Sequence, residues 1–251
     1  MQKNPTSALL IIGNEILSGR TLDLNTQHIA TTLGSVGIDL LEVRVVPDTE
    51  TEIIDAVNFL RKKYMYVFTT GGIGPTHDDI TSEAIAKAFG LKYVLHPEAF
   101  DILLKHYGGS QNLNDGRTKM AYMPEGAKLI ANLVSAAPGF VVENVYVMAG
   151  VPKIMQAMLE AIIHTLKTGQ VVVSKTINIK IAESKIATIL SDVQKKYMAV
   201  SIGSYPYMKG DEYKDGGVNI VLRCTDNLLL EKACAELLAI FKNLNYITHE
   251  E

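Results

Sequence analysis

The 251-residue sequence is poor in cysteine, in net charge and in long apolar runs, and each shortage argues against a class of protein. Its two cysteines, Cys224 and Cys234, have no metal-binding spacing and form no disulfide framework, so we expect a cytoplasmic, reducing compartment. A net charge of −3 gives no basic balance that would suit a nucleic acid, and no nucleic-acid partner is expected. The apolar run at residues 8–12 is too short for a signal peptide or a membrane span, so no membrane partner is expected either.

Two common nucleotide-binding fingerprints are also missing. No segment matches the P-loop pattern GxxxxGK[ST]. The glycine cluster near residue 72 does not match the dinucleotide fingerprint, because His77 stands where the third glycine would be. A phosphate-binding loop in this chain must therefore work without either of these motifs.

Apolar segments alternate between strand-like and helical spacing through the first two thirds of the chain. Strands are expected near residues 8–12, 43–46 and 64–70, and helices near 29–36, 53–60 and 80–89. This alternation predicts an α/β three-layer sandwich with a mostly parallel sheet. Further along, we expect a helix from Pro97, a polar loop at 108–116, a hairpin at 141–148 and a helix from Pro152.

The composition becomes polar around residues 167–170, and we place a domain boundary there. The predicted domains are 1–168, the α/β sandwich, and 169–251, a small α+β domain with a βαββα pattern. Alternating apolar residues indicate its strands, and helical spacing indicates helices near 186–193 and 228–241.

The most informative segment is TTGGIGPTHDDIT at residues 69–81, which follows an apolar, strand-like run. A strand, a tight glycine loop and a helix start form an arrangement in which α/β proteins hold phosphates. Gly71, Gly72 and Gly74 let the backbone approach a ligand closely, and Thr76 adds a hydroxyl. We therefore predict that these four residues bind the ligand.

Paired acids end the same segment. Asp78 and Asp79 beside an anion would be repulsive unless a cation lies between them, so we predict that both bind a divalent metal and act in catalysis. The alternative is that Thr76 and Asp79 form a capping box, with both acids opening the following helix. Glu83, one turn after Asp79, is a further candidate metal ligand or a solvated acid. His77 is expected to be an exposed loop residue.

Two other loops follow predicted strands and should meet the first at the carboxyl edge of the sheet. Gly13, Asn14 and Ser18 are candidate ligand-binding residues, and Glu15 is a candidate metal ligand or a simple turn acid. Asp48, after Val46-Pro47, is a candidate catalytic carboxylate or a helix N-cap.

Three later positions complete the candidate binding residues. Lys119 lies in a polar stretch, where it could hold a phosphate or be a surface charge. Asn132 and the small-residue loop through Pro138 and Gly139 would let a flat ligand lie against the backbone. These loops, with the one after residue 148, would enclose a cleft.

Several long motifs, in order along the chain, resemble the CinA-type branch of the molybdopterin-binding-like family. The resemblance covers about residues 6–165 and is carried by GNEILSGRTLDLNTQHIATTLGSVGI, VPDTETEI, TTGGIGPTHDDIT, KMAYMPEGA and NLVSAAPGF. The βαββα region resembles the small domain that follows in CinA-type proteins. Ile154 replaces a glutamate of the family pattern, and the sequence ends without the deamidase domain of longer CinA proteins, so deamidase activity is not expected.

The resemblance implies a metal-dependent hydrolase of nucleotide diphosphates such as ADP-ribose or FAD. It also implies a divalent cation (Mg²⁺, Mn²⁺ or Co²⁺), with K⁺ as a further candidate, and a homo-oligomer, with a dimer favoured. Two alternatives stay open: a molybdopterin-binding or molybdenum-cofactor biosynthesis protein, and a non-catalytic nucleotide-binding regulatory module. The residue types do not distinguish a pterin ligand from a nucleotide.

Overall fold

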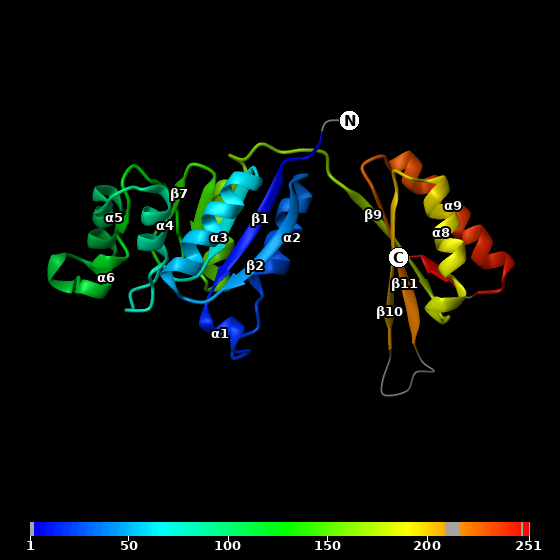
Figure 1. The fold of residues 1–251 in the computed structure, drawn as a ribbon, viewed down its shortest axis with the longest axis horizontal. Coiled ribbons are helices and arrows are strands. Elements are labelled where there is room, and N and C mark those ends of the chain that lie inside the picture. The colour runs from blue at the N-terminus through cyan, green and yellow to red at the C-terminus, as the bar shows by residue number, and fades with distance from the viewer. Residues whose placement is uncertain (1–2, 209–215, 247, 251) are drawn as a thin grey trace. The chain divides into compact units, whose positions relative to one another are not determined.

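The chain forms two compact units, Met1–Gly169 and Gln170–Glu251, in a computed structural model that describes residues 3–208, 216–246 and 248–250 (Figure 1). Each unit has its own sheet and its own apolar core. Within the described residues, no helix has the length and apolar character needed to cross a membrane.

The first unit is organised around a six-stranded sheet in the order β2-β1-β3-β8-β7-β6. Its strands are β1 (Thr6–Ile12), β2 (Asp39–Val46), β3 (Tyr66–Thr70), β6 (Lys128–Ile130), β7 (Gly139–Val142) and β8 (Val145–Met148). The four strands from β2 to β8 are parallel to their neighbours, whereas β7 and β6 pair antiparallel. The prediction of a mostly parallel sheet and of the 141–148 hairpin is confirmed.

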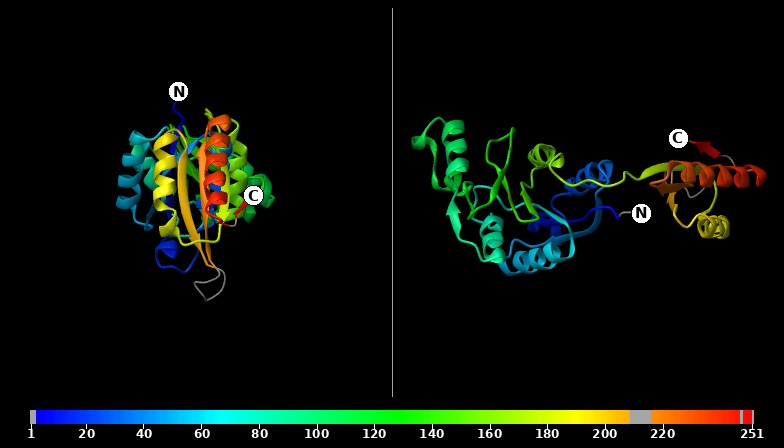
Figure 2. Two further views of the ribbon diagram at one scale, coloured as in Figure 1. Left: turned by 90° about the vertical axis from the view of Figure 1, so that its right-hand side faces the viewer. Right: turned by 90° about the horizontal axis from the view of Figure 1, so that it is seen from above.

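Helices cover both faces of this sheet, as the view from above in Figure 2 shows. Helices α2 (Asn25–Ser35) and α7 (Pro152–Ile163) lie on one face, and α3 (Glu50–Lys63) and α4 (Thr81–Phe89) lie on the other. Strand β1 is apolar from Ala8 to Ile12 because it faces both layers: Leu9 packs in the core under α2 and α7, and Leu10 in the core under α3 and α4. The predicted three-layer sandwich is confirmed.

Smaller elements extend the first unit beyond this sheet. They are α1 (Asn14–Leu17), β4 (Tyr93–Leu95), α5 (Pro97–Tyr107), a 3₁₀ turn (Ser110–Asn112), α6 (Asp115–Lys119) and β5 (Tyr122–Pro124). Strands β4 and β5 pair antiparallel. The loop predicted at 108–116 is wrong in part, because Asn114 caps a short helix by accepting a hydrogen bond from the Arg117 N–H at 2.9 Å.

The second unit is a four-stranded antiparallel sheet in the order β10-β11-β9-β12, with helices on one face (Figure 2). Its elements are β9 (Val173–Ile179), a 3₁₀ turn (Glu183–Lys185), α8 (Ala187–Lys196), β10 (Ser201–Tyr207), β11 (Gly217–Cys224), α9 (Asn227–Asn243) and β12 (Thr248–Glu250). Alternate residues of the central strands, such as Ile177 and Ile220, pack under α9 in a core of their own. The structure adds β12 to the predicted βαββα pattern.

Candidate functional site

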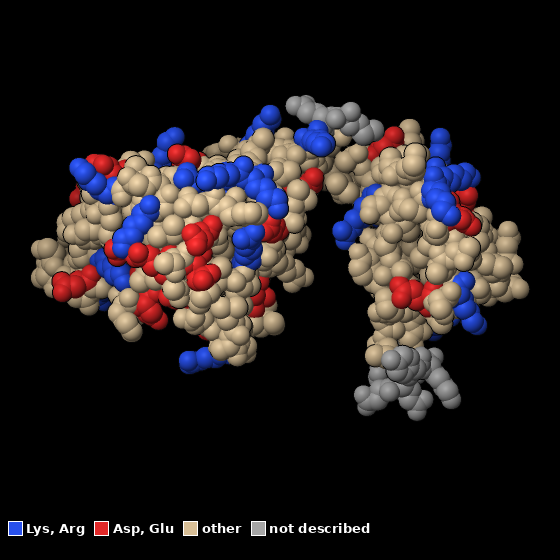
Figure 3. All heavy atoms as spheres, viewed as in Figure 1, with Lys and Arg blue, Asp and Glu red and all other residues tan. Residues whose placement is uncertain are grey.

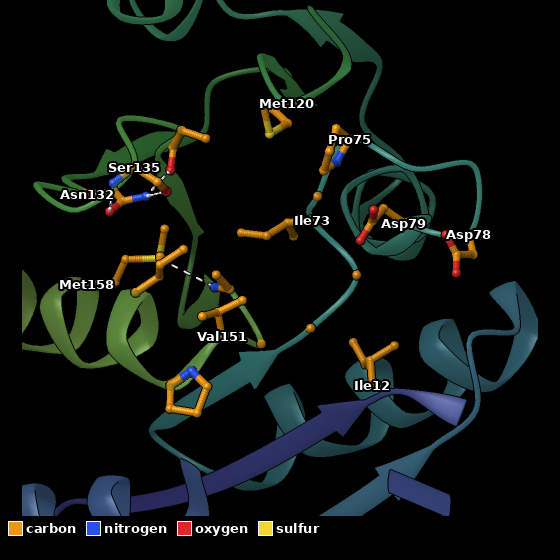
Figure 4. Close-up of a pocket in the computed structure, with 18 of the residues that line it drawn as sticks. Ile12, Ile73, Pro75, Asp78, Asp79, Met120, Asn132, Ser135, Val151 and Met158 are labelled. Carbon is orange, nitrogen blue, oxygen red and sulfur yellow. Dashed lines mark hydrogen bonds between the residues drawn. The ribbon is translucent and has the colours of Figure 1, made fainter. Parts of the chain in front are cut away.

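A pocket of about 610 Å³ opens at the carboxyl ends of the parallel strands in the first unit (Figure 4). The loops after β1, β2, β3 and β8 contribute Glu15, Asp48, Gly71 and Ala149 to its lining. Parallel strands bring their carboxyl ends to one edge, which is why segments far apart in sequence meet here. The cleft predicted from these loops is present in the structure.

The glycine loop after β3 forms the centre of this pocket. Gly71 has φ 104° and Gly72 has φ 68°, conformations that disfavour a side chain. A Cβ atom at Gly71 would overlap the carbonyl oxygen of Ile12, and one at Gly72 would overlap the hydroxyl of Thr81. Gly74 also lines the pocket, and a side chain there would overlap the Asp79 carboxylate. These glycines are therefore required by the backbone path, and they leave the loop open to a ligand.

The paired acids lie in a tight turn directly after this loop. The Thr76 hydroxyl oxygen is 2.6 Å from Asp78 Oδ1 and 2.5 Å from Asp79 Oδ2. A hydroxyl carries one proton, so it cannot fully satisfy both carboxylates at once. The Thr76 N–H also donates to Asp79 Oδ2 at 2.8 Å. Two negative groups thus converge on one threonine, and like charges held together favour a cation.

The environment of Asp78 keeps its carboxylate charged. The hydrogen bond from Thr76 is the main cause that lowers the pKa of Asp78 below its ordinary value, with help from a backbone N–H and from His77 and Lys119. His77 itself is 98% exposed and does not line the pocket, as expected for a loop residue.

The alternative, a capping box of Thr76 and Asp79, is present only in part: the Thr76 N–H donates to the Asp79 carboxylate as in a capping box, but the acids do not open the following helix. Helix α4 begins at Thr81, and its N-cap residue, Ile80, makes no side-chain hydrogen bond. The bonds between Thr76 and Asp79 instead close a turn that ends before the helix. In Figure 4, Asp78 and Asp79 lie on the opposite side of the glycine loop from the Ile73 side chain.

The acids of the first two loops also line the pocket. The Asn14 N–H donates to Asp48 Oδ2 at 2.8 Å, which joins the loops after β1 and β2. The Glu15 carboxylate lies over Gly13, and the Ser18 hydroxyl donates to the Glu15 carbonyl at 3.3 Å. Gly13, Asn14 and Ser18 do not line the pocket themselves. They support the loop that presents Glu15.

The opposite wall is apolar apart from one amide and one hydroxyl. Asn132 lines the pocket, but its amide is fully used: it donates to Ser135 Oγ and the Ala137 carbonyl, and it accepts from two backbone N–H groups. It therefore shapes the loop at 132–137, in which Ala136 has φ 64°. Pro138 and Gly139 are buried and do not line the pocket.

Gly139 has a packing role in β7. A side chain there would come within 2.5 Å of the Val147 carbonyl oxygen and 3.2 Å of Met158 Sδ. The need for glycine at this position is therefore explained by the sheet, without a ligand.

Two of the predicted charged residues lie outside the lining. The Lys119 ammonium donates to the Thr76 carbonyl at 2.5 Å, so it braces the turn that carries the acids. Glu83 pairs with Lys87 at 2.9 Å on the surface of α4. The prediction that Glu83 and Asp79 face the same side of a helix is wrong. Asp79 lies before the start of α4, so the helical repeat does not relate the two residues.

Several lining residues were not predicted. Tyr107, Met120, Val151 and Met158 supply apolar surface, and Ile73 points into the space between the walls (Figure 4). Ile73 lies within the glycine motif itself, but Tyr107 at the end of α5 carries no local signal. Among all the residues that line the pocket, four are Asp or Glu and none is Lys, Arg or His. Ile154, which replaces the family glutamate, also lines it.

One observation argues against a metal ion held by these residues alone, and another favours a cation nearby. Within the described part of the chain, no three His, Cys, Asp or Glu side chains are grouped closely enough to hold an ion by themselves. A second chamber of about 60 Å³ adjoins the pocket and is lined by Glu15, Asp23, Asn25 and Thr70, among others. The buried Oδ1 of Asn25 and Oγ1 of Thr70 have no hydrogen-bond partner in the structure. Hard oxygen donors of this kind suit a hard cation.

Comparisons with known proteins agree with this architecture. Residues 8–168 match the family described as "Probable molybdopterin binding domain". The chain belongs to this family. In this family member, residues 171–250 match a second family, described as "FAD synthase, middle domain".

Relatives of this family member include archaeal proteins. A protein of Archaeoglobus fulgidus is 36% identical over 198 residues, which cover 79% of this chain and 84% of the relative. One of Caldivirga maquilingensis is 37% identical over 194 residues, covering 74% and 76%. The crystal structure of the protein CinA with unknown function from Thermoplasma acidophilum is similar at 34% identity, with a TM-score of 0.61, and the match covers 65% of this chain and 99% of that one. The predicted resemblance to CinA-type proteins is confirmed.

Proposed function

We propose that the protein is a metal-dependent hydrolase of nucleotide diphosphates of the ADP-ribose or FAD kind. The observation that carries the proposal is the uneven charge of the pocket. Its polar side presents four carboxylates and no basic side chain. A diphosphate is repelled by such a surface unless cations lie between the two, so a phosphorylated ligand here requires a metal ion.

Size and shape support the nucleotide part of the proposal. A volume of about 610 Å³ is within the range of small-molecule and cofactor pockets. The wall with Ile73, Met120 and Met158 offers an apolar surface for a flat base, at a distance along the pocket from the acids (Figure 4). The match of residues 171–250 to a domain of FAD synthase also fits a nucleotide-related ligand.

In this proposal each group of residues has its own role. Asp78 and Asp79 would supply two ligands of a divalent ion, and diphosphate oxygens and water the others, with Glu15 acting through water, because no three acidic side chains of the described residues are grouped closely enough to hold an ion by themselves. The chemistry of such an ion is to neutralise the phosphoryl oxygens and acidify a water molecule. The backbone N–H groups of the glycine loop at 72–74 would face the diphosphate oxygens, whereas the Gly71 N–H already donates to the Met148 carbonyl at 3.2 Å. Asp48, fixed by the Asn14 N–H, would orient the attacking water and accept its proton. K⁺ would find oxygen ligands in the chamber of Asn25 and Thr70.

A second candidate is a molybdopterin-binding protein. The family description favours it, and the same apolar wall would accept a pterin ring beside a phosphate. A third candidate, a regulatory module that binds a nucleotide without turnover, uses the same contacts and differs only in the chemical step.

One experiment separates the three. The purified full chain is incubated with ADP-ribose, FAD or NADH in the presence of Mg²⁺, Mn²⁺ or Co²⁺, with and without K⁺, and AMP release is measured. Metal-dependent AMP release supports the hydrolase. Tight molybdopterin binding with no AMP release would sink the hydrolase and favour the pterin protein, whereas nucleotide binding without turnover favours the regulatory module.

A further inference from the structure

Strand β2 (Asp39–Val46) lies at one edge of the six-stranded sheet. In the described part of the chain only β1 pairs with it. A parallel strand directs the backbone groups of alternate residues toward each side, so β2 presents a row of N–H and C=O groups without a partner strand. The other edge strand, β6, is only three residues long and offers far less.

The side chains of β2 differ between its two faces. Val43 and Val45 lie on the face that carries α2 and are 42% and 37% exposed, so this apolar surface is only partly covered. On the other face, Glu42 pairs with Arg44 at 2.5 Å and with Lys63 of α3 at 2.8 Å, so Arg44, with its further N–H groups, is the residue able to reach a second partner. Leu41, at the irregularity in the pairing with β1, is 60% exposed.

We propose that two copies of the chain pair edge to edge through β2, antiparallel, around a two-fold axis that passes at Val43. Two identical edges can pair antiparallel in this way only with the axis perpendicular to the sheet, which places residues of the same face opposite each other. In this register Val43 lies opposite Val43 of the second copy, and Leu41 lies opposite Val45. Glu42 then faces Arg44 of the second copy, and Arg44 faces Glu42.

Charge selects this register over its neighbours. A shift of the axis to residue 42 would set Glu42 opposite its own copy, and a shift to residue 44 would set Arg44 opposite its own copy. Opposite charges across an antiparallel pair are favourable, and like charges are unfavourable. The segment LEVRV at 41–45 is thus complementary to itself in one register only.

Helix α3 (Glu50–Lys63), which packs over this part of the sheet, adds to the complementarity. Its first turn carries Glu50 and Glu52, and its last turn carries Arg61, Lys62 and Lys63. Figure 3 shows basic side chains toward one end of the α3 region and acidic ones toward the other. The two-fold axis makes α3 antiparallel to its copy, so the acidic end of one helix and the basic end of the other lie toward the same end of the paired strands. Phe59, which is 49% exposed beneath the Arg44 guanidinium at 4.2 Å, lies on the same side.

Cysteine cross-linking of the full chain tests the interface residue by residue. The axis places residue 43 against itself, at a Cα separation of about 4.5–5.5 Å in an antiparallel pair, which suits a disulfide. We expect Val43→Cys to form a covalent dimer on mild oxidation. Val45→Cys alone should not, but a mixture of Val45→Cys and Leu41→Cys chains should cross-link. The native Cys224 and Cys234 are buried, so the wild-type chain is the background control.

Sedimentation of the unmodified chain and of charge variants completes the test. The wild type should sediment at twice the mass of the 27.5 kDa chain. Arg44→Glu sets like charges opposite each other and should weaken the dimer at least about tenfold. Glu42→Arg combined with Arg44→Glu restores opposite charges in the same register, and Lys63→Glu is added so that residue 42 keeps an opposite charge beside it in its own chain. This triple variant should restore the dimer, with circular dichroism checking that each variant is folded.

Three results would overturn the proposal. A wild-type monomer at micromolar concentration would exclude any dimer. A dimer that Val43→Cys does not cross-link uses another surface. Cross-linking of Val45→Cys to itself, as efficient as that of Val43→Cys, would place the axis in a different register.

Discussion

The backbone N–H of Asn14 donates to the carboxylate of Asp48 at 2.8 Å, across 34 residues of sequence. This bond ties the loop after β1 to the loop after β2 at the mouth of the pocket. The other carboxylate oxygen of Asp48 takes no part in this bond, and Asp48 lines the pocket. Asp48 can therefore serve as a base or as a support for the loop, and one pair of substitutions distinguishes the two roles.

Asp48→Asn keeps an oxygen that can accept the Asn14 N–H but removes the negative charge. If Asp48 takes a proton from water, this change lowers kcat about 10²- to 10⁴-fold. The acidic limb of the pH–rate profile should disappear as well. Steady-state kinetics with ADP-ribose measures both effects. Activity retained in Asp48→Asn but lost in Asp48→Ala would instead show that the residue only supports the loop.

The turn at 76–79 predicts a link between one hydroxyl and metal affinity. Thr76→Val removes the donor that lowers the pKa of Asp78, so that pKa should rise toward its ordinary value. Protons then compete with the metal at higher pH, and the acidic limb of metal binding moves upward. Loss of such a supporting contact typically costs about 10- to 100-fold in metal affinity.

The matched control is Thr76→Ser, which keeps the hydroxyl. Titration with Mn²⁺ over a range of pH values compares the two variants. Equal metal affinity and equal pH dependence in both would mean that Thr76 has no part in holding the acids. An unchanged melting temperature in both variants would show that the turn is not needed for folding.

Much of this fold was predictable because its signals are local. The continuous apolar run that ends at Ile12 marks a strand buried on both faces, and Pro152 marks the first turn of α7. The glycine loop and the paired acids were also recognisable, since they form one contiguous motif. The prediction from helical spacing was wrong where it placed the start of α4 too early in the sequence. Asp79 lies two residues before α4, so counting one turn onward to Glu83 did not bring them together.

Other parts of the site depend on tertiary packing that no local pattern reveals. Lys119 reaches the Thr76 carbonyl across 43 residues, and nothing in its own segment indicates this contact. Tyr107 joins the lining only because the tertiary fold brings the end of α5 to the pocket. The sequence also marks Asn132 as a ligand-binding candidate, whereas the structure uses its whole amide within the loop at 132–137.

Glu83 offers a direct test of the metal-ligand set. Its carboxylate pairs with Lys87 and does not line the pocket, so Glu83→Gln should leave metal-dependent turnover within about twofold of wild type, as most surface changes do. Asp78→Asn, in contrast, removes a carboxylate from the pocket and should abolish the metal response. The apparent affinity for Mn²⁺ in the turnover assay compares them. A raised metal requirement in Glu83→Gln would return this residue to the ligand set.

The glycine loop predicts a steric effect on stability that depends on more than backbone angle. Gly71 and Gly19 both have positive φ, at 104° and 72°. A Cβ at Gly19 meets nothing within 4 Å, so Gly19→Ala should cost only about 1–2 kcal/mol for the backbone conformation. A Cβ at Gly71 would overlap the Ile12 carbonyl, so Gly71→Ala should cost at least about 4 kcal/mol. Urea unfolding of the two variants measures the difference, and equal costs would mean that the loop can move away from β1 freely.

Glu42 predicts how stability changes in acid. Contacts from Lys63, Tyr64 and Arg44 lower the pKa of Glu42 from 4.5 to about 2. Because the pKa in the folded state lies below the ordinary value, the stabilisation is complete above about pH 4.5 and is lost as the pH falls through about 2. Solvent screening reduces it to roughly 1–2 kcal/mol, since the side chain is 20% exposed. Glu42→Gln should therefore be less stable than wild type by this amount at neutral pH, and the difference in unfolding free energy should disappear in acid.

Urea unfolding at two protein concentrations separates this effect of Glu42 from any loss of dimer. A gap that stays constant down to the acidic limit would show that the charge of Glu42 does not contribute.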